Sequence, residues 1–331
     1  KEVGFELSLF KNRVSIEATA YVQDNTNQIL SIQLSRSTGY SSSLVNAADF
    51  TNKGLEFDLR LTPVVDLGEF RFNFKGNFTL QDSKVNSVYE GLPEVGIGNS
   101  NFAITGYPAF MFKLTDYIRS PEGKVIVNAT TGLPSQNPIV TMFGRTMPKY
   151  ILGVTPSFEW RGLSLTVTAD YRAGHQVYNG AGPDMDFTGI SIRSATNGRM
   201  RFVVPNSVYA DASGKYVQNT DVLVRAGGYG FFEASATNRG IQSNYLTSAA
   251  AWKIRELALS YDLPSSLIKS ARFIKGVSIG LVGRNLLMFL PKTNEWSDPE
   301  FANTTGNALG VNGTGQLPPS RIYGFNVNLR F

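Results

Sequence analysis

Residues 321–331 read RIYGFNVNLRF, and large apolar residues alternate in them with small or polar ones. Because successive side chains of a β-strand point to opposite faces, this pattern predicts a strand with one wholly apolar face. In a transmembrane barrel such a strand has a direct explanation, since one face meets lipid and the other meets the lumen. The apolar set consists of Tyr323, Phe325, Val327, Leu329 and Phe331.

The same alternation recurs along the chain and predicts eight further strands. Segments of about ten residues with unbroken alternation suit a membrane span better than the roughly 5–6 residues of a usual soluble strand. A one-sided soluble sheet would need a second layer, and no amphipathic helical stretch is long enough to provide it, although a sandwich of two sheets stays open. The eight strands are expected at residues 2–10, 14–22, 54–61, 70–80, 150–160, 163–171, 252–263 and 277–281.

Two of these strands contain an irregularity. Pro156 falls on the apolar face of strand 150–160, and because proline cannot donate to a ladder we expect a bulge or local kink there. In strand 252–263 the apolar residues change from even to odd positions. One inserted residue near Arg255 would form a bulge and keep both sets on one face.

Composition excludes several classes of protein. The 331 residues include 31 Lys plus Arg and 26 Asp plus Glu without a concentrated basic patch, so the charge does not argue for nucleic acid. There is no Cys, which excludes disulfides and thiolate metal sites. No apolar run approaches the roughly 18 residues of a membrane helix.

The expected connections alternate between short and long. An outer-membrane barrel has short turns on its periplasmic rim and long loops outside the cell, whereas a sandwich has no reason to sort its loops in this way. The predicted fold is therefore an all-β transmembrane antiparallel barrel. Short connections are expected at 11–13, 63–68 and 161–162, a moderate one at 264–276 with a helical turn at 264–269, and long ones at 23–52, 81–149, 172–251 and 291–319.

The number of strands makes a further prediction about domain organisation. Nine is odd, whereas single-chain bacterial barrels have an even number of strands and both ends on the periplasmic rim. We therefore expect strands before residue 1, so that residues 1–331 form the C-terminal part of one larger barrel domain.

Several motifs, in this order, resemble SusC/RagA-type TonB-dependent outer-membrane transporters of Bacteroidetes. The most specific motif is WKIRELALSYDLP at 252–264, followed by GRNL at 283–286 and SDPE at 297–300. NKGLEF at 52–57 resembles a strand start of the family, and PSR at 319–321 precedes the terminal strand. The resemblance covers nearly the whole chain.

This resemblance implies that the nine strands are the last of a barrel of about 22. It implies an N-terminal plug domain outside this sequence, contact with the TonB complex through that N-terminal region, and a SusD-like surface lipoprotein as an extracellular lid. The implied function is import of glycan oligomers or peptides across the outer membrane, without a cofactor or enzymatic activity. Phe331 and the rest of the apolar set resemble the signal read by the barrel-assembly machinery.

The expected faces give candidate binding residues. Polar residues opposite the apolar set would face the lumen, and aromatic residues in the long loops could stack on sugar rings, pack on a lid or, by default, pack among the loops. The lumen-facing candidates are Glu56, Asp58, Arg60, Arg71, Lys75, Asp170, Asp262 and Arg284. The loop aromatic candidates are Tyr107, Phe110, Tyr178, Tyr229, Phe231 and Phe232. Aromatic residues near the strand ends would form girdles at the lipid interface: Tyr150, Trp160, Tyr171, Trp252 and Tyr261.

No catalytic residue or metal site is expected. His175, the single histidine, is interpreted as structural or solvated, and GGYG at 227–230 as a flexible loop in which no helix starts. Two groups of loop carboxylates lack EF-hand spacing and are interpreted as solvated. They are Glu295, Asp298 and Glu300, and Asp184 with Asp186. The leading hypothesis is an importer, and the alternative is an extracellular binding or adhesion β-protein without transport.

Overall fold

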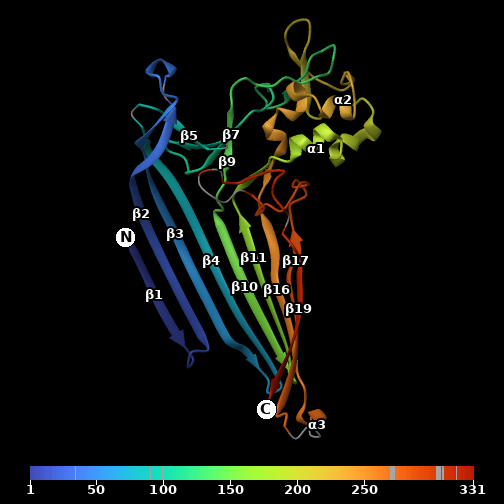
Figure 1. Cartoon of the computed structure of the whole chain (residues 1–331). Coiled ribbons are helices and arrows are strands. Elements are labelled where there is room, and N and C mark those ends of the chain that lie inside the picture. The colour runs from blue at the N-terminus through green and yellow to red at the C-terminus, as the bar shows by residue number, and fades with distance from the viewer. Residues whose placement is uncertain are drawn as a thin grey trace.

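A nine-stranded antiparallel sheet forms a long curved wall in the computed structural model (Figure 1). The structure describes residues 1–331 except 34, 90, 99, 269–272, 303–306, 308 and 318. The nine predicted strands are confirmed, and they pair in chain order. They are β1 (Glu2–Leu9), β2 (Val14–Gln33), β3 (Ser42–Asp66), β4 (Phe70–Val88), β10 (Tyr150–Trp160), β11 (Leu163–Ala173), β16 (Ala251–Asp262), β17 (Gly276–Phe289) and β19 (Ile322–Arg330).

The register of the wall aligns the apolar positions into one continuous face. Phe57 of β3 pairs with Phe78 of β4, which pairs with Leu152, and Tyr171 of β11 pairs with Trp252 of β16. Directly paired residues project to the same side of a sheet, so these rows extend the apolar face from strand to strand. Within this chain the face is uncovered, as the 78% exposure of Phe325 illustrates.

Aromatic residues border this face near both ends of the strands. Tyr150 and Trp160 terminate β10 on the apolar side, and Tyr171 stacks on Trp252 with ring centroids 5.0 Å apart. The ten steps from Tyr150 to Trp160 span about 33 Å of strand, or about 25 Å of height at a tilt of about 40°. This height matches the apolar band of an outer-membrane barrel.

Short turns lie at one end of the wall and long connections at the other (Figure 1). The boundaries of two expected connections were wrong. Segment 23–52 is largely strand, because β2 and β3 continue as a paired hairpin above the apolar face, with buried Ile32 and Ala47 packed against Val95. The turn expected at 63–68 lies after Asp66, since β3 continues past a bulge beyond Leu61.

The regions 81–149 and 172–251 are folded, which corrects their interpretation as long loops. Two loop elements meet in a parallel pair, β8 (Val125–Ile126) with β13 (Ser207–Ala210), and Val125 belongs to a core that includes Val224 and Phe231. The additional strands are β5 (Glu94–Gly98), β6 (Asn101–Ile104), β7 (Met111–Leu114), β9 (Thr141–Arg145), β12 (Gln176–Asn179), β14 (Tyr216–Gln218), β15 (Leu246–Ser248) and β18 (Val311–Asn312). The helices are η1 (Arg36–Thr38), α1 (Gly182–Thr188), η2 (Ile192–Arg199), α2 (Tyr229–Phe232), η3 (Ser235–Arg239), η4 (Gln242–Tyr245) and α3 (Ser265–Ile268).

Two helices bear on sequence predictions. The helical turn expected at 264–269 is confirmed by α3, although Lys269 lies outside the described residues. A short helix, α2, starts within the GGYG motif at Tyr229, so the interpretation of that motif as a flexible loop was wrong. None of the helices in the described part of the chain has the length and apolar character needed to cross a membrane.

The predicted irregularity at Pro156 is not a bulge. Pro156 pairs with Phe74 of β4, while pairing with β11 lapses at Thr155 and Pro156 and resumes in the same register. A proline has no N–H to donate, so the ladder loses bonds on one side without gaining a residue.

The predicted bulge near Arg255 is confirmed. Thr168 of β11 pairs with Glu256 and Ala169 pairs with Ile254, which leaves Arg255 as an extra residue. A second bulge follows in β17, where Asn285 adopts a φ of 54° opposite Arg255. Asparagine tolerates this left-handed conformation better than most residues, so the sequence suits the site.

Candidate functional site

Strand β16 places two cations above the polar face of the wall, beside its bulge. Lys253 lies between Trp252 and Ile254 of the apolar face, so its side chain projects to the opposite side, where it is only 8% exposed. Arg255, the bulged residue, projects to the same side. The bulge lets the next residue, Glu256, project to this side as well, because the extra residue breaks the strict alternation of the strand.

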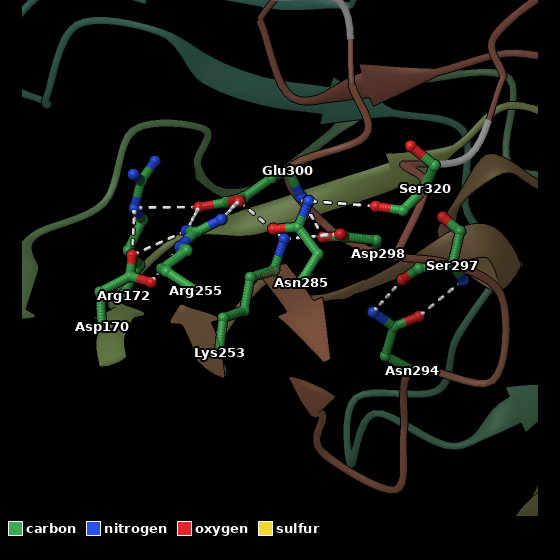
Figure 2. A network of polar contacts seen from close by, with 10 residues as sticks. All are labelled: Asp170, Arg172, Lys253, Arg255, Asn285, Asn294, Ser297, Asp298, Glu300 and Ser320. Atoms are coloured by element: carbon green, nitrogen blue, oxygen red, sulfur yellow. Dashed lines mark hydrogen bonds and ion pairs between the residues drawn. The ribbon is translucent and has the colours of Figure 1, made fainter. Parts of the chain in front are cut away.

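Two carboxylates of the loop between β17 and β19 approach these cations (Figure 2). Lys253 Nζ donates to Asp298 Oδ2 at 2.5 Å and to Glu300 Oε2 at 2.6 Å. Arg255 Nη1 donates to Glu300 Oε2 at 2.7 Å, and Arg255 also contacts Glu300 Oε1. The SDPE motif thus binds the WKIRE motif, although 45 residues separate Arg255 from Glu300.

Two residues of the neighbouring strand β11, Asp170 and Arg172, complete this group of charged side chains, which is called the network. Arg255 Nη2 donates to Asp170 Oδ2 at 2.8 Å, and Arg172 Nε lies 3.3 Å from Asp170 Oδ2 and 3.1 Å from Glu300 Oε1. Three cations therefore face three carboxylates in a partly buried site. Removing one partner from such a network leaves an uncompensated charge in a poorly solvated place, which costs more than breaking an exposed pair.

The network determines the ionisation of the loop carboxylate. Burial alone would raise the pKa of Glu300, but hydrogen bonds from Arg255 and Lys253, with the charges of Lys253 and Arg172, lower it to about 2. Glu300 is consequently ionised at any physiological pH, and the contacts to the wall persist.

His175 lies just above the end of β11, beside the network. Burial lowers the pKa of His175 to about 4, and the positive charge of Arg172 acts in the same direction, whereas Glu300 opposes it. Its Nδ1 is buried without a hydrogen-bond partner among the described residues. His175 is therefore a neutral, structural side chain at pH 7.

The same loop also binds the folded loop elements. Ser297 Oγ donates to Asn179 Oδ1 at 3.1 Å, and Asn312 Nδ2 donates to that oxygen at 2.9 Å. Trp296 packs on Tyr245 with ring centroids 5.5 Å apart. Segment 296–300 thus contacts the loop elements with one end and the wall with the other.

A buried polar cluster lies behind Tyr245. The Tyr245 hydroxyl donates to Asp186 Oδ2 at 2.6 Å, and Asn238 Nδ2 donates to the same oxygen at 2.9 Å. Burial and the hydrogen bond to Asp186 raise the pKa of Tyr245 well above its usual range. The cluster fixes α1 against η3 and η4, since its members come from these elements or their ends.

The interpretation of the loop carboxylates as solvated was wrong for most of them. Asp186 is fully buried, Asp298 and Glu300 are bound in the network, and Glu295 Oε1 lies 3.3 Å from Arg193 Nε. No group of three or more His, Asp or Glu side chains in the described part of the chain is arranged to hold a metal ion.

The eight lumen-facing candidates all lie on the side opposite the apolar face: seven lie between residues of that face, and Arg284 pairs with Glu256. Only Asp170 belongs to the network. The others occur in local pairs: Arg60 with Glu17 (3.9 Å), Arg71 with Asp66 (3.4 Å) and Glu159 (3.6 Å), Arg284 with Glu256 (2.8 Å), and Asp262 with Ser278. The side chains of Glu56, Asp58 and Lys75 make no hydrogen bond or ion pair to another described residue. A role of these residues in contacting cargo stays a prediction.

The loop aromatic candidates separate into two groups. Phe231 and Phe232 are buried in a core with Phe202, so they offer no surface for stacking on a sugar. Phe110 and Tyr178 are half-buried, whereas Tyr107 and Tyr229 are exposed.

The sequence predictions missed Lys253, Arg255 and Arg172 as site residues. Two signals in the sequence could have identified them. Lys253 alternates with the apolar residues Trp252 and Ile254, and the SDPE motif at 297–300 carries two carboxylates that could pair with the cations of the WKIRE motif at 252–256. A cavity of about 480 Å³ adjoins the network and is lined by Lys253, Arg255, Met288, Trp296, Asp298 and Glu300, among others.

Comparisons with known proteins place this fold. The chain is 22% identical to TonB-dependent receptor P26 and 23% identical to TonB-dependent receptor P39, both of Formosa agariphila; the matches cover 96% and 92% of the chain but 32% and 33% of the relatives. The fold matches a chain of the RagAB peptide importer with TM-scores of 0.68 in the closed-closed state and 0.70 in the open-open state. Those matches have 21% and 20% identity and cover 99% and 100% of this chain, but 35% and 34% of the other. No family model matches the sequence.

These matches confirm the predicted resemblance to SusC/RagA-type TonB-dependent receptors of Bacteroidetes, the barrel fold and the outer-membrane location. The chain spans about a third of the length of the relatives and structures that it matches.

Proposed function

We propose that this chain forms the C-terminal part of the wall of a TonB-dependent outer-membrane importer. The observation that carries the proposal is the nine-stranded sheet itself, with one continuous apolar face, one polar face and connections sorted by length between its ends. A membrane barrel requires this combination, because its outside meets lipid and its inside meets water.

The edges of the sheet support the proposal that further strands complete the barrel. β1 and β19 are the terminal strands of the sheet, and among the described residues each pairs with one neighbour only. Unpaired backbone groups are not tolerated in lipid, so a spanning sheet must close. We propose that strands outside residues 1–331 pair with both edges, and that a plug domain and a TonB-contacting segment belong to the same whole protein.

The cargo that we propose is an oligomer of sugars or amino acids, delivered with a SusD-like lipoprotein as a lid. The RagAB structures are named for a peptide importer, which supports the peptide alternative. The folded loop elements support a lid, since they form an ordered platform above the wall. We propose that the protein performs transport and no bond chemistry, in keeping with relatives named as receptors.

Uptake by whole cells tests the proposal. A strain that lacks the whole gene is compared with the same strain complemented by the gene, using fluorescent peptides and oligosaccharides as cargo. We expect complementation to restore uptake of at least one class, and expect loss of the TonB protein to abolish it. Surface binding without uptake in the complemented strain would instead favour the extracellular binding or adhesion protein.

A further inference from the structure

A short segment of the last loop is bound on both sides. Residues 294–300, called the strut below, contact the folded loop elements through Trp296 and Ser297, and contact the wall through Asp298 and Glu300. Ser297 and Asp298 are adjacent, so their Cα atoms are about 3.8 Å apart. No further residue therefore separates the contact with the loop elements from the contact with the wall.

The strut is stiffened by its own hydrogen bonds. Asn294 Oδ1 accepts from the backbone N–H of Trp296 at 3.2 Å, and Asn294 Nδ2 donates to the Ser297 carbonyl at 2.9 Å. Asp298 Oδ1 accepts from the backbone N–H of Glu300 at 2.9 Å. Pro299 lies between the two wall-binding carboxylates and fixes its own φ. A segment held in this way moves as a unit rather than by bending.

The loop-side attachment leads into the buried cluster. Asn179, which accepts from Ser297 and Asn312, donates from Nδ2 to the Tyr245 carbonyl at 3.1 Å. Tyr245 in turn donates to Asp186, whose side chain is fully buried. Every member of this series is at most half-exposed, so its geometry is set by packing and not by solvent.

The wall-side attachment is equally enclosed. The side chains of Lys253 and Asp298 are 10% and 11% exposed, and Glu300 joins Lys253 to Arg255. These residues also line the cavity of about 480 Å³ beside the network. A shift of the strut therefore changes the shape and charge of that cavity.

We infer that the strut couples the folded loop elements mechanically to the wall, so that a displacement of α1 and η4 is transmitted through Ser297 and Asp298 to Lys253 and Arg255. The inference rests on the proposed function, in which cargo or a lid would move the loops. It assigns the SDPE motif a conformational role and not a cargo contact.

Hydrogen exchange in the full-length receptor tests the coupling. Asn179→Ala removes the acceptor of the Ser297 hydroxyl and the link to the Tyr245 carbonyl without touching β16, and the backbone amides of residues 251–256 are followed by mass spectrometry. We expect the exchange of these amides to accelerate about three- to tenfold, because the interaction free energy between coupled positions corresponds to a change of about this size in an equilibrium constant. Asn179→Ala combined with Lys253→Met should accelerate exchange less than the product of the single effects.

Asn219→Ala is the matched control. Asn219 is 4% exposed and, like Asn179, makes three side-chain hydrogen bonds within the loop elements, but none of its partners belongs to the strut. We expect exchange at 251–256 to equal that of the wild type in this variant. Ser297→Ala, which removes a single hydroxyl, provides the same test if Asn179→Ala also unfolds the buried cluster around Tyr245.

Equal exchange at 251–256 in the wild type, Asn179→Ala and Ser297→Ala would overturn the coupling, as would strictly multiplicative effects in the double variant. Uptake is measured in parallel. Normal uptake with no coupling would refute the strut and leave the importer intact, whereas coupling without uptake of any cargo would refute the importer alone.

Discussion

Arg255 donates to the Glu300 carboxylate over 2.7 Å, which joins a bulge in a strand of the wall to a loop 45 residues later. Neither residue alone would join the wall to the last loop. Arg255 follows Ile254 of the apolar face and so directs its guanidinium to the polar face, and the turn at Pro299 returns the carboxylate to it. The pair explains why two distant sequence motifs occur together: each supplies one sign of charge to a common site.

Glu300→Gln should release the loop from the wall. The substitution keeps the size of the side chain but removes the charge that faces Arg255, Lys253 and Arg172, so we expect a local loss of about 1–3 kcal/mol. The measurement is limited proteolysis of the loop at 291–319, together with exchange of the Phe301 amide. Cleavage should accelerate while the barrel still assembles.

Glu69→Gln serves as the control for this prediction. Glu69 pairs with Arg161 at the opposite end of the wall, but both side chains are about two-thirds exposed. An exposed ion pair contributes about 1 kcal/mol or less, so stability should hardly change. Equal effects of both substitutions would contradict the buried, cooperative character assigned to the network.

Stability should fall as the pH drops from about 6.5 to about 4. In this window the unfolded state protonates His175 whereas the folded state, in which its pKa is about 4, does not, so the unfolded state gains protons and is favoured. We expect the wild type to lose about 1–3 kcal/mol more than His175→Gln, after allowance for partial exposure. If the stability of the wild type and of His175→Gln fell equally with pH, the imidazole of His175 would not be held neutral in the folded state.

The three tryptophans should differ in their contact with lipid. Trp160 and Trp252 lie at the two aromatic borders of the apolar face, whereas Trp296 packs on Tyr245 in the loops. In variants that keep one of them, lipids brominated near the headgroup should quench Trp160 and Trp252 but not Trp296. Strong quenching of Trp296 would place the loops in the membrane and would contradict the orientation of the wall.

Deletion of Phe331 should impair insertion of the barrel. The residue ends the apolar set that resembles the assembly signal, and 73% of its surface is exposed in this chain. We expect less heat-modifiable protein in the outer membrane for the deletion than for Arg330→Gln, which changes the polar face of the same strand. Unchanged assembly after the deletion would remove the basis for that signal.

Period-two alternation was sufficient to predict the wall, because each face of a spanning strand meets a single solvent. The phase change at Ile254 likewise revealed the bulge at Arg255. The hairpin above the membrane was missed because both faces of 23–52 are largely polar, so its residues have no contrast by which a strand could be recognised.

The site could be predicted only in part. Asp170 was identified as lumen-facing from its own strand, but its partner Arg255 lies 85 residues away on β16, and Arg255 in turn binds Glu300 of the last loop. Such proximity depends on tertiary packing, which no local pattern encodes. The loop regions were misjudged for a similar reason, since their short strands pair across different loops, as β8 does with β13.

Cysteine scanning of β19 tests the central claim most directly, and the absence of native cysteine in this chain leaves no background from it. Single cysteines at Phe325, Val327 and Leu329 are compared with single cysteines at Asn326 and Asn328, in the full-length protein in outer membranes. A membrane-impermeant maleimide, applied after the membranes have been opened, should label the even positions and spare the odd ones. Equal labelling of neighbouring positions would contradict a wall with one lipid face and one lumen face.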